Sequence, residues 1–198
     1  MNKKYVWIGG GILISAAFLG WLFWASTRPL PGEKLPDLGR EHIEIGKEAA
    51  YNSNPPTSGS HYVDWVRAGV YTEPKDDRNL VHSLEHGYVV MHYKCDLPVI
   101  LEGAQRPIGS NEKDSIATPS APLQNDTNGK CDSRKAQLEE IYNKKGKSKL
   151  IVIVRPNLET SFALTAWTYL DKFNDFDAAR IEKFIDAHLN NGPERTME

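Results

Sequence analysis

Two histidines stand four residues apart in the stretch LVHSLEHG, which runs from Leu80 to Gly87. On a helix, residues four apart are neighbours whose Cβ atoms lie about 5–6 Å from each other. The side chains of His82 and His86 could therefore chelate one ion, and imidazole suits zinc, copper, iron and nickel. The spacing predicts a transition-metal site, for which a third ligand is still needed.

His61 is the first choice for this third ligand, because it ends a second distinctive segment, YNSNPPTSGSH. The two prolines fix backbone φ and Gly59 supplies freedom, so the segment can hold the histidine as firmly as a preorganised site requires. Met91 and His92 are the next candidates, and because they alternate across a strand only one can face the site. Met91 would favour Cu(I), whereas His92 would favour zinc or Cu(II).

The same histidines also allow a metal-free interpretation. A histidine pair on a short buried helix can simply be hydrogen-bonded to the backbone and to Glu85. In a metal site, Glu85 would instead accept a hydrogen bond from a ligating histidine and fix its orientation. A further alternative pairs Glu85 with Arg67, Lys94 or Arg155.

A peptidase is the third interpretation, since HSLEH matches the pattern H-x-x-E-H, in which two histidines bind zinc and the glutamate is the general base. That chemistry needs a long helix and a downstream acidic ligand. Here Gly87 follows the second histidine at once, and nothing selects among Glu139, Glu140 and Glu182. We therefore favour a non-enzymatic domain.

The elements that must position these residues can be predicted from the pattern around them. NLVHSLEHG is expected to be a short helix with Asn79 as N-cap and Gly87 after its end, and YVVMHY a central strand. EHIEIG, KLIVIVRP and FALTAWTYL are further strands, and SRKAQLEEIYNKKGK is a helix. FDAARIEKFIDAHLNNGP is an amphipathic helix with Asp175 as N-cap. Without strict alternation of strand and helix, the class is α+β: a single small domain with a central sheet and flanking helices.

The N-terminal segment carries no charge from Tyr5 to Ser26. Some 21 helical residues rise about 31 Å, which matches the hydrocarbon core of a bilayer. We expect a single transmembrane helix before the domain rather than a cleaved signal peptide, because no A-x-A-like site follows. Lys3 and Lys4 predict a cytoplasmic N-terminus and a domain outside the cell membrane. The expected parts are a cytoplasmic tail (1–4), an anchor (5–26), a Pro-rich spacer (27–40), an extracytoplasmic domain (41–194) and a surface loop within it (105–129).

Composition and cysteine content agree with this location. The net charge of −2 gives no basic surface for nucleic acid. Cys95 and Cys131 are the two cysteines, and an even pair in an oxidising compartment predicts one disulfide. Buried free thiols or metal thiolates are the alternatives.

The segments YNSNPPTSGSH, GVY, LVHSLEHGYVVMHY, LIVIVRP and ALTAWTYLDKF occur in the order found in the domain of unknown function 3105 family, and FIDAHLNNGPE fits as well. The chain resembles that family from about residue 41 to 194. The loop between the cysteines departs from the pattern as a long insertion. The resemblance implies a membrane-anchored or secreted prokaryotic protein with a shared fold unit, and it implies no activity.

We expect a membrane-anchored extracytoplasmic domain that binds copper or zinc through His61, His82 and His86. We interpret His42, in a strand near the linker, and His188, at an edge of the last helix, as structural residues. The alternative is a metal-free interaction domain or accessory subunit of a membrane assembly, in which the histidines form a buried polar network.

Overall fold

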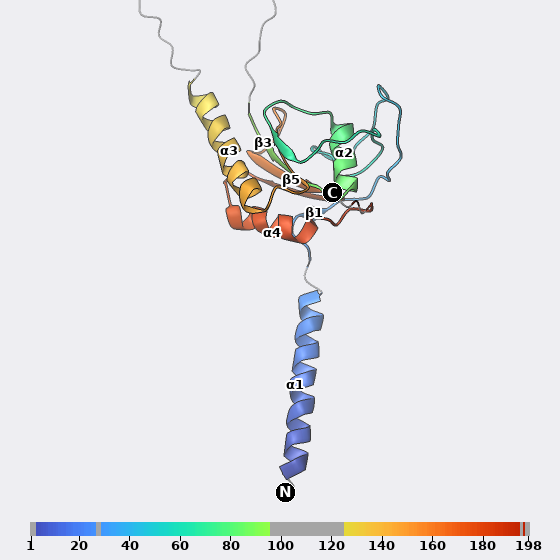
Figure 1. Cartoon of the computed structure of the whole chain (residues 1–198), viewed down its shortest axis with the longest axis vertical. Coiled ribbons are helices and arrows are strands. Elements are labelled where there is room, and N and C mark those ends of the chain that lie inside the picture. The colour runs from blue at the N-terminus through green and yellow to red at the C-terminus, as the bar shows by residue number, and fades with distance from the viewer. Residues whose placement is uncertain (1–2, 27–28, 96–124, 195, 197–198) are drawn as a thin grey trace, which may run out of the picture. The chain divides into compact units, whose positions relative to one another are not determined.

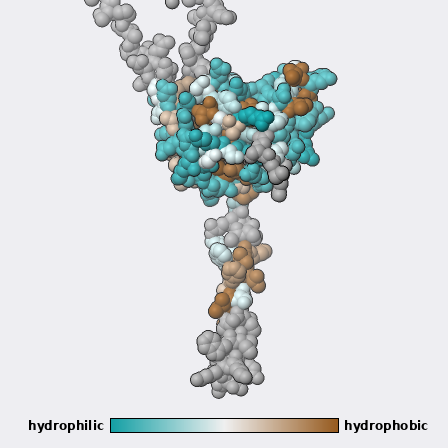
Figure 2. All heavy atoms as spheres, viewed as in Figure 1, coloured by the Kyte–Doolittle hydropathy of each residue, from teal (hydrophilic) through white to brown (hydrophobic). Residues whose placement is uncertain are grey.

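The computed structural model of the chain describes residues 3–26, 29–95, 125–194 and 196, which form two compact units, Met1–Pro31 and Gly32–Glu198. The first unit contains helix α1 (Lys3–Ser26). Figure 2 colours the described side chains of α1 mostly brown, for hydrophobic residues, whereas the face of the second unit in view is mostly teal. None of the helices, as far as the chain is described, combines the length and the apolar character that crossing a membrane requires.

The second unit is built on one six-stranded mixed sheet (Figure 1). Its strands lie in the order β1-β6-β5-β3-β4-β2. Their bounds are β1 (Glu33–Lys34), β2 (Gly69–Tyr71), β3 (Val89–Tyr93), β4 (Leu150–Val154), β5 (Phe162–Ala166) and β6 (Tyr169–Phe173). Strand β4 runs parallel to β3 and β2, and the other neighbours are antiparallel. The expected α+β class and the central position of YVVMHY are confirmed.

Helices cover both faces of the sheet. Successive side chains of a strand point to opposite faces, and the buried strands carry apolar side chains on both. Met91 of β3 faces α3 (Asn125–Lys144) and α4 (Ala178–His188), in one core cluster with Leu138 and Phe184. Val90 belongs to the cluster on the other face, where Leu84 of α2 (Asp77–Glu85) packs. Helix α2 therefore lies on the opposite side of the sheet from α3 and α4.

Two strand predictions were wrong in detail. FALTAWTYL is not one strand but two, β5 and β6, because Trp167 and Thr168 form a tight turn in which Thr168 has φ +61°. EHIEIG is not a regular strand, since His42 makes only an isolated parallel bridge to His61. The expected spacer 27–40 contains β1, which pairs with β6.

The N-caps of two helices also differ from the prediction. The carboxylate of Asp76 accepts a hydrogen bond from the backbone N–H of Arg78, so α2 begins before Asn79. Asp177, not Asp175, caps α4 in the same way. In both helices an aspartate fills the position, as N-cap preferences require, but the sequence offered more than one suitable residue.

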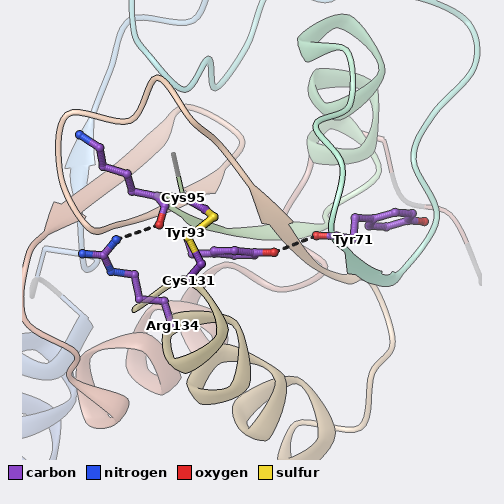
Figure 3. Close-up of a disulfide and its surroundings, with 6 residues drawn as sticks. Tyr71, Tyr93, Cys95, Cys131 and Arg134 are labelled. Atoms are coloured by element: carbon purple, nitrogen blue, oxygen red, sulfur yellow. Dashed lines mark hydrogen bonds between the residues drawn. A yellow bond between two sulfur atoms is a disulfide. The ribbon is translucent and has the colours of Figure 1, made fainter. Parts of the chain in front are cut away.

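The disulfide Cys95–Cys131 joins the end of β3 to α3, as the cysteine count predicted (Figure 3). Nearby, Arg134 of α3 donates hydrogen bonds to the carbonyl oxygen of Lys94 at 2.8 Å and to Oγ of Ser161 at 3.1 Å. The predicted loop 105–129 lies mostly outside the described residues, and its last part, from Asn125, belongs to α3. The bridge and the arginine therefore fix α3 on the sheet.

Candidate metal centre

Helix α2 presents His82, Glu85 and His86 on its buried last turn, where all three side chains are almost fully enclosed. Gly87 follows with φ +80°, and a Cβ there would lie 2.8 Å from Cα of Asn190. The glycine was predicted at this position. It ends the helix and also lets the C-terminal chain pass close behind it.

A second segment, Gly59 to Tyr62, lies against α2 and is held by backbone hydrogen bonds. The N–H of Gly59 donates to the carbonyl of Gly39 at 2.9 Å, and the N–H of His61 donates to that of Glu41 at 2.9 Å. Gly59 has φ +122°, a conformation open chiefly to glycine. The segment therefore holds His61 in place through tertiary contacts.

Two backbone carbonyls fix the orientation of two histidine rings. Nδ1 of His61 lies 2.7 Å from the carbonyl oxygen of Gly59, and Nδ1 of His82 lies 2.7 Å from that of Tyr62. A carbonyl oxygen only accepts, so each Nδ1 carries the proton. In the neutral rings both Nε2 atoms then have a free lone pair, which is how ligating histidines are held in metal sites.

The two Nε2 atoms face further ligand atoms. Nε2 of His61 lies 2.9 Å from Oε2 of Glu85, and Nε2 of His82 lies 3.0 Å from Nε2 of His86. Atoms that bind one ion at about 2.0–2.1 Å lie roughly 3–3.5 Å from each other, so both contacts suit a shared ion. Burial, with smaller contributions from His86 and His61, lowers the pKa of His82 to about 4. His82 is therefore neutral at pH 7, as a metal ligand must be.

Two groups of side chains could hold a metal ion within the part of the chain that the structure describes. In each group the ligand atoms all lie within 4.8 Å of one another. The inner group is His42, His61, His82 and Glu85, and the outer group is His82, His86 and Glu194. The three ligands expected from the sequence are thus divided between the groups, and His82 is common to both.

His42 and Glu194 are members that sequence reasoning missed. His42 was interpreted as structural, yet its ring centroid lies 4.9 Å from that of His61 and 5.0 Å from that of His82. The strand-like alternation around His42 indicated an extended segment, but it did not identify His61 as the residue that this segment pairs with. Oε2 of Glu194 lies 3.7 Å from Nε2 of His86, and no local pattern marked this residue.

The other candidate ligands lie elsewhere. Met91 packs beneath α3 and α4, on the sheet face away from α2. Nε2 of His92 lies 3.1 Å from Oγ1 of Thr165, and complete burial holds the pKa of His92 well below its usual value. His188 is not at a helix edge but buried, with its ring against those of Tyr169 and Phe184.

The partners expected for Glu85 also differ. Arg155 pairs with Asp77, and Arg67 lies over the ring of Trp65. Besides His61, it is Arg40 that approaches Glu85, at 3.7 Å from Oε1. Glu85 is thus a buried carboxylate whose polar neighbours are histidines and one arginine.

The acidic residues considered for a peptidase do not join the cluster. Glu182 pairs with Lys144 at 2.6 Å, and α3, which carries Glu139 and Glu140, packs on the opposite face of the sheet. The helix that carries HSLEH has nine residues, as short as the glycine predicted.

Comparison with known proteins identifies the family of the chain. The family model described as "Protein of unknown function (DUF3105)" matches residues 42–128 and 126–198, so the match includes the residues of both groups. No curated protein and no solved structure matches the chain. The chain belongs to the DUF3105 family of proteins of unknown function.

Proposed function

We propose that the domain binds one copper or zinc ion at the histidine cluster, with Nε2 of His82 as the central ligand. The observation that carries the proposal is the pair of hydrogen bonds from Nδ1 of His61 and His82 to backbone carbonyls, each 2.7 Å long. These bonds fix the tautomer and turn the lone pair of each Nε2 toward other ligand atoms. Because buried histidines without a metal also bond to backbone carbonyls, these bonds support a metal site together with the convergence of the ligand atoms within 4.8 Å.

The contact between His61 and Glu85 supports the same proposal. Because Nδ1 of His61 carries the proton, Nε2 of the neutral ring and the carboxylate both present lone pairs across 2.9 Å. Either a second proton on the ring or a cation between the two atoms makes this contact favourable. A divalent ion would also stabilise the buried carboxylate of Glu85 further, beyond the charge of Arg40 at 3.7 Å from Oε1.

The donor set favours zinc or Cu(II). The cluster offers imidazole nitrogens and carboxylate oxygens, and soft sulfur ligands, which would select Cu(I), do not belong to it: Met91 faces the other core and both cysteines are bridged. We propose that His82 binds the ion together with either His61 and Glu85 of the inner group or His86 of the outer group. His42 and Glu194 complete the two groups at their exposed ends.

We also propose that residues 5–26 anchor the protein in the cell membrane, with the N-terminus in the cytoplasm and the domain outside. The uncharged run after Lys4 supports this location, and so does the disulfide, which is typical of oxidising compartments. Membrane fractionation followed by protease treatment of intact cells tests it. Recovery of the chain in the soluble fraction would contradict it, and so would a domain that resists the protease in intact cells.

The binding test uses the full chain in detergent, dialysed against zinc or copper, with bound metal measured by elemental analysis. We expect one equivalent for the wild type and none for His82→Ala/His86→Ala. His188→Phe is the matched control, because the ring of His188 packs against Tyr169 and Phe184 and His188 belongs to neither group of candidate ligands. Circular dichroism checks that each variant folds. A wild type that binds neither metal above background would end the proposal.

The metal-free alternative, an interaction domain or accessory subunit, predicts a different result. It expects a fixed membrane partner that co-purifies in the presence of chelators, with the histidines acting as a polar network between α2 and the segment 59–62. Zinc-dependent cleavage of generic peptides that is lost in Glu85→Gln would instead support a peptidase. The contact between Glu85 and His61 argues against a peptidase, because the carboxylate that would have to act as general base is already paired with His61.

A further inference from the structure

The inner and outer groups share a single ligand atom. Nδ1 of His82 donates its proton to the carbonyl of Tyr62, so Nε2 is the atom of this ring that can bind a metal. One imidazole lone pair binds one ion at a time. The two groups can therefore not both be complete, although His82 belongs to each.

Each group also has one exposed member, and the two exposed members come from opposite ends of the domain sequence. In the inner group, His61 and Glu85 are buried while the side chain of His42 is 45% exposed. In the outer group, His86 is buried while the side chain of Glu194 is 49% exposed. An ion bound to His82 can thus be approached through His42 or through Glu194.

Backbone hydrogen bonds hold Glu194 at the cluster, although its side chain is at the surface. The N–H of Glu194 donates to the carbonyl of Glu85 at 3.1 Å, and that of Asn190 donates to the carbonyl of Gly87 at 2.8 Å. Gly192 packs so closely that a Cβ on it would collide with the carbonyl oxygen of Glu85. The C-terminal strap, residues 190–194, is therefore fixed on the end of α2.

Lys149 also helps to hold the C-terminal strap on the end of α2. Its buried Nζ donates to the carbonyl of His86 at 3.0 Å and to that of Thr196 at 2.6 Å. The same ammonium group thus ties the end of α2 to the chain just after the strap. Both members of the outer group besides His82 are positioned by these contacts.

We propose that the two groups are two positions of a single metal ion, which passes between them while His82 stays bound. The proposal rests on the proposed function and deepens it: the domain would be a relay that accepts an ion at one exposed ligand and releases it at the other. At the outer position the ion is held by His82, His86 and Glu194, and at the inner position by His82, His61, Glu85 and His42.

The passage is an exchange of ligands and changes no oxidation state. The bonds from the ion to His86 and Glu194 break as bonds to His61, Glu85 and His42 form, the proton between Nε2 of His61 and Oε2 of Glu85 leaves to solvent, and the bond to Nε2 of His82 persists. The ring centroids of His61 and His86 lie 4.9 Å and 4.5 Å from that of His82, so the ion needs to move only a few ångströms. The proton that lies between the Nε2 atoms of His82 and His86 in the ion-free protein moves through solvent to Nδ1 of His86 when the ion binds there.

Cobalt(II) is the probe for the test, because its visible spectrum reports the ligand set. We titrate the full chain in detergent and expect one equivalent of Co²⁺ with the wild type. Glu194→Gln should keep one equivalent, with uptake about 10-fold slower and affinity correspondingly lower because the charged entry ligand is lost. Glu85→Gln should also keep one equivalent, but with a changed spectrum, since the ion is confined to the outer position. Glu159→Gln, which removes a surface carboxylate that pairs with Lys172, is the matched control and should leave the rates unchanged.

The outcomes separate this inference from the proposed function. If the wild type binds no Co²⁺, or if His82→Ala binds as well as the wild type, the proposed function fails. If the wild type binds two equivalents, and Glu85→Gln and Glu194→Gln each remove one of them, the protein has two independent sites and the relay is overturned. Unchanged rates in Glu194→Gln would overturn it as well.

Discussion

Gly192→Ala is the change that most directly tests how the C-terminal strap is built. A Cβ at this position would overlap the carbonyl oxygen of Glu85 and the N–H of Gly87, and would lie 2.8 Å from Cα of Gly87. These are backbone atoms that cannot rotate away. The strap must therefore move off the end of α2 to admit one methyl group.

The magnitude follows from the contacts that the strap would lose. Two backbone hydrogen bonds, from Asn190 to Gly87 and from Glu194 to Glu85, hold it in place. At about 0.5–1.5 kcal/mol each, their loss lowers the free energy of unfolding by about 1–3 kcal/mol. For a domain of this size we expect the melting temperature to fall by about 2–12 °C. Glu194 would leave His86, so metal affinity should also fall by about 10-fold.

The assay combines thermal melting by circular dichroism with a zinc titration of the full chain in detergent. Gly129→Ala is the matched control: Gly129 lies in α3, and a Cβ there would have no atom within 4 Å. The control should be neutral or more stable by up to about 1 kcal/mol, because alanine favours helix. If Gly192→Ala melts with the wild type and binds zinc equally well, the strap does not hold Glu194 as described, and our reasoning is refuted.

Three other predictions concern the stability of the domain. Cys95→Ser/Cys131→Ser opens a loop of sequence separation 36 and should lower the free energy of unfolding by about 4 kcal/mol, measured with guanidinium at unchanged pH. Because the pKa of His82 is lowered to about 4 in the folded protein, the unfolded chain takes up a proton first as the pH falls. Stability should thus be complete above about pH 6.5 and decline from there toward pH 4, and His82→Gln should show a smaller decline; an equal decline in melting temperature would contradict the assignment. Arg155→Lys should lower the free energy of unfolding by about 2–3 kcal/mol, since the guanidinium donates to both carboxylate oxygens of Asp77 and to Oδ1 of Asn54, whereas Lys172→Gln, at an exposed ion pair, should change it by less than about 1 kcal/mol.

The parts of the fold that could be predicted from the sequence are those fixed by local periodicity. Val89 to Tyr93 forms a central strand because a run of β-branched and aromatic residues is buried on both faces. The turn at Trp167 and Thr168 escaped prediction because neither residue is a usual turn former. Thr168 adopts φ +61°, which its β-branched side chain does not favour, so tertiary contacts outweigh its local preference.

In the candidate site, too, the residues that could be predicted are those placed by local spacing. His82 and His86 were predicted as neighbours because helical geometry alone brings residues four apart together, and their Nε2 atoms lie 3.0 Å from each other. His42 reaches the cluster only through its bridge to His61, and Glu194 only through the strap on α2. Both depend on contacts between segments far apart in the chain, about which spacing within one segment says nothing.

The two motifs depend on each other more closely than a shared set of ligands requires. The carbonyl oxygens that hold Nδ1 of His61 and of His82 belong to Gly59 and Tyr62, which stand on either side of His61 in one segment. The segment Gly59 to Tyr62 therefore supplies one proposed ligand, His61, and also fixes the tautomer of His82 on α2. His61 without this backbone conformation would leave His82 free to turn its ring, and HSLEH without the segment would lack both a partner and an orientation. Gly59 adopts φ +122°, which favours glycine, and its carbonyl oxygen accepts from Nδ1 of His61, so this glycine takes part in building the site.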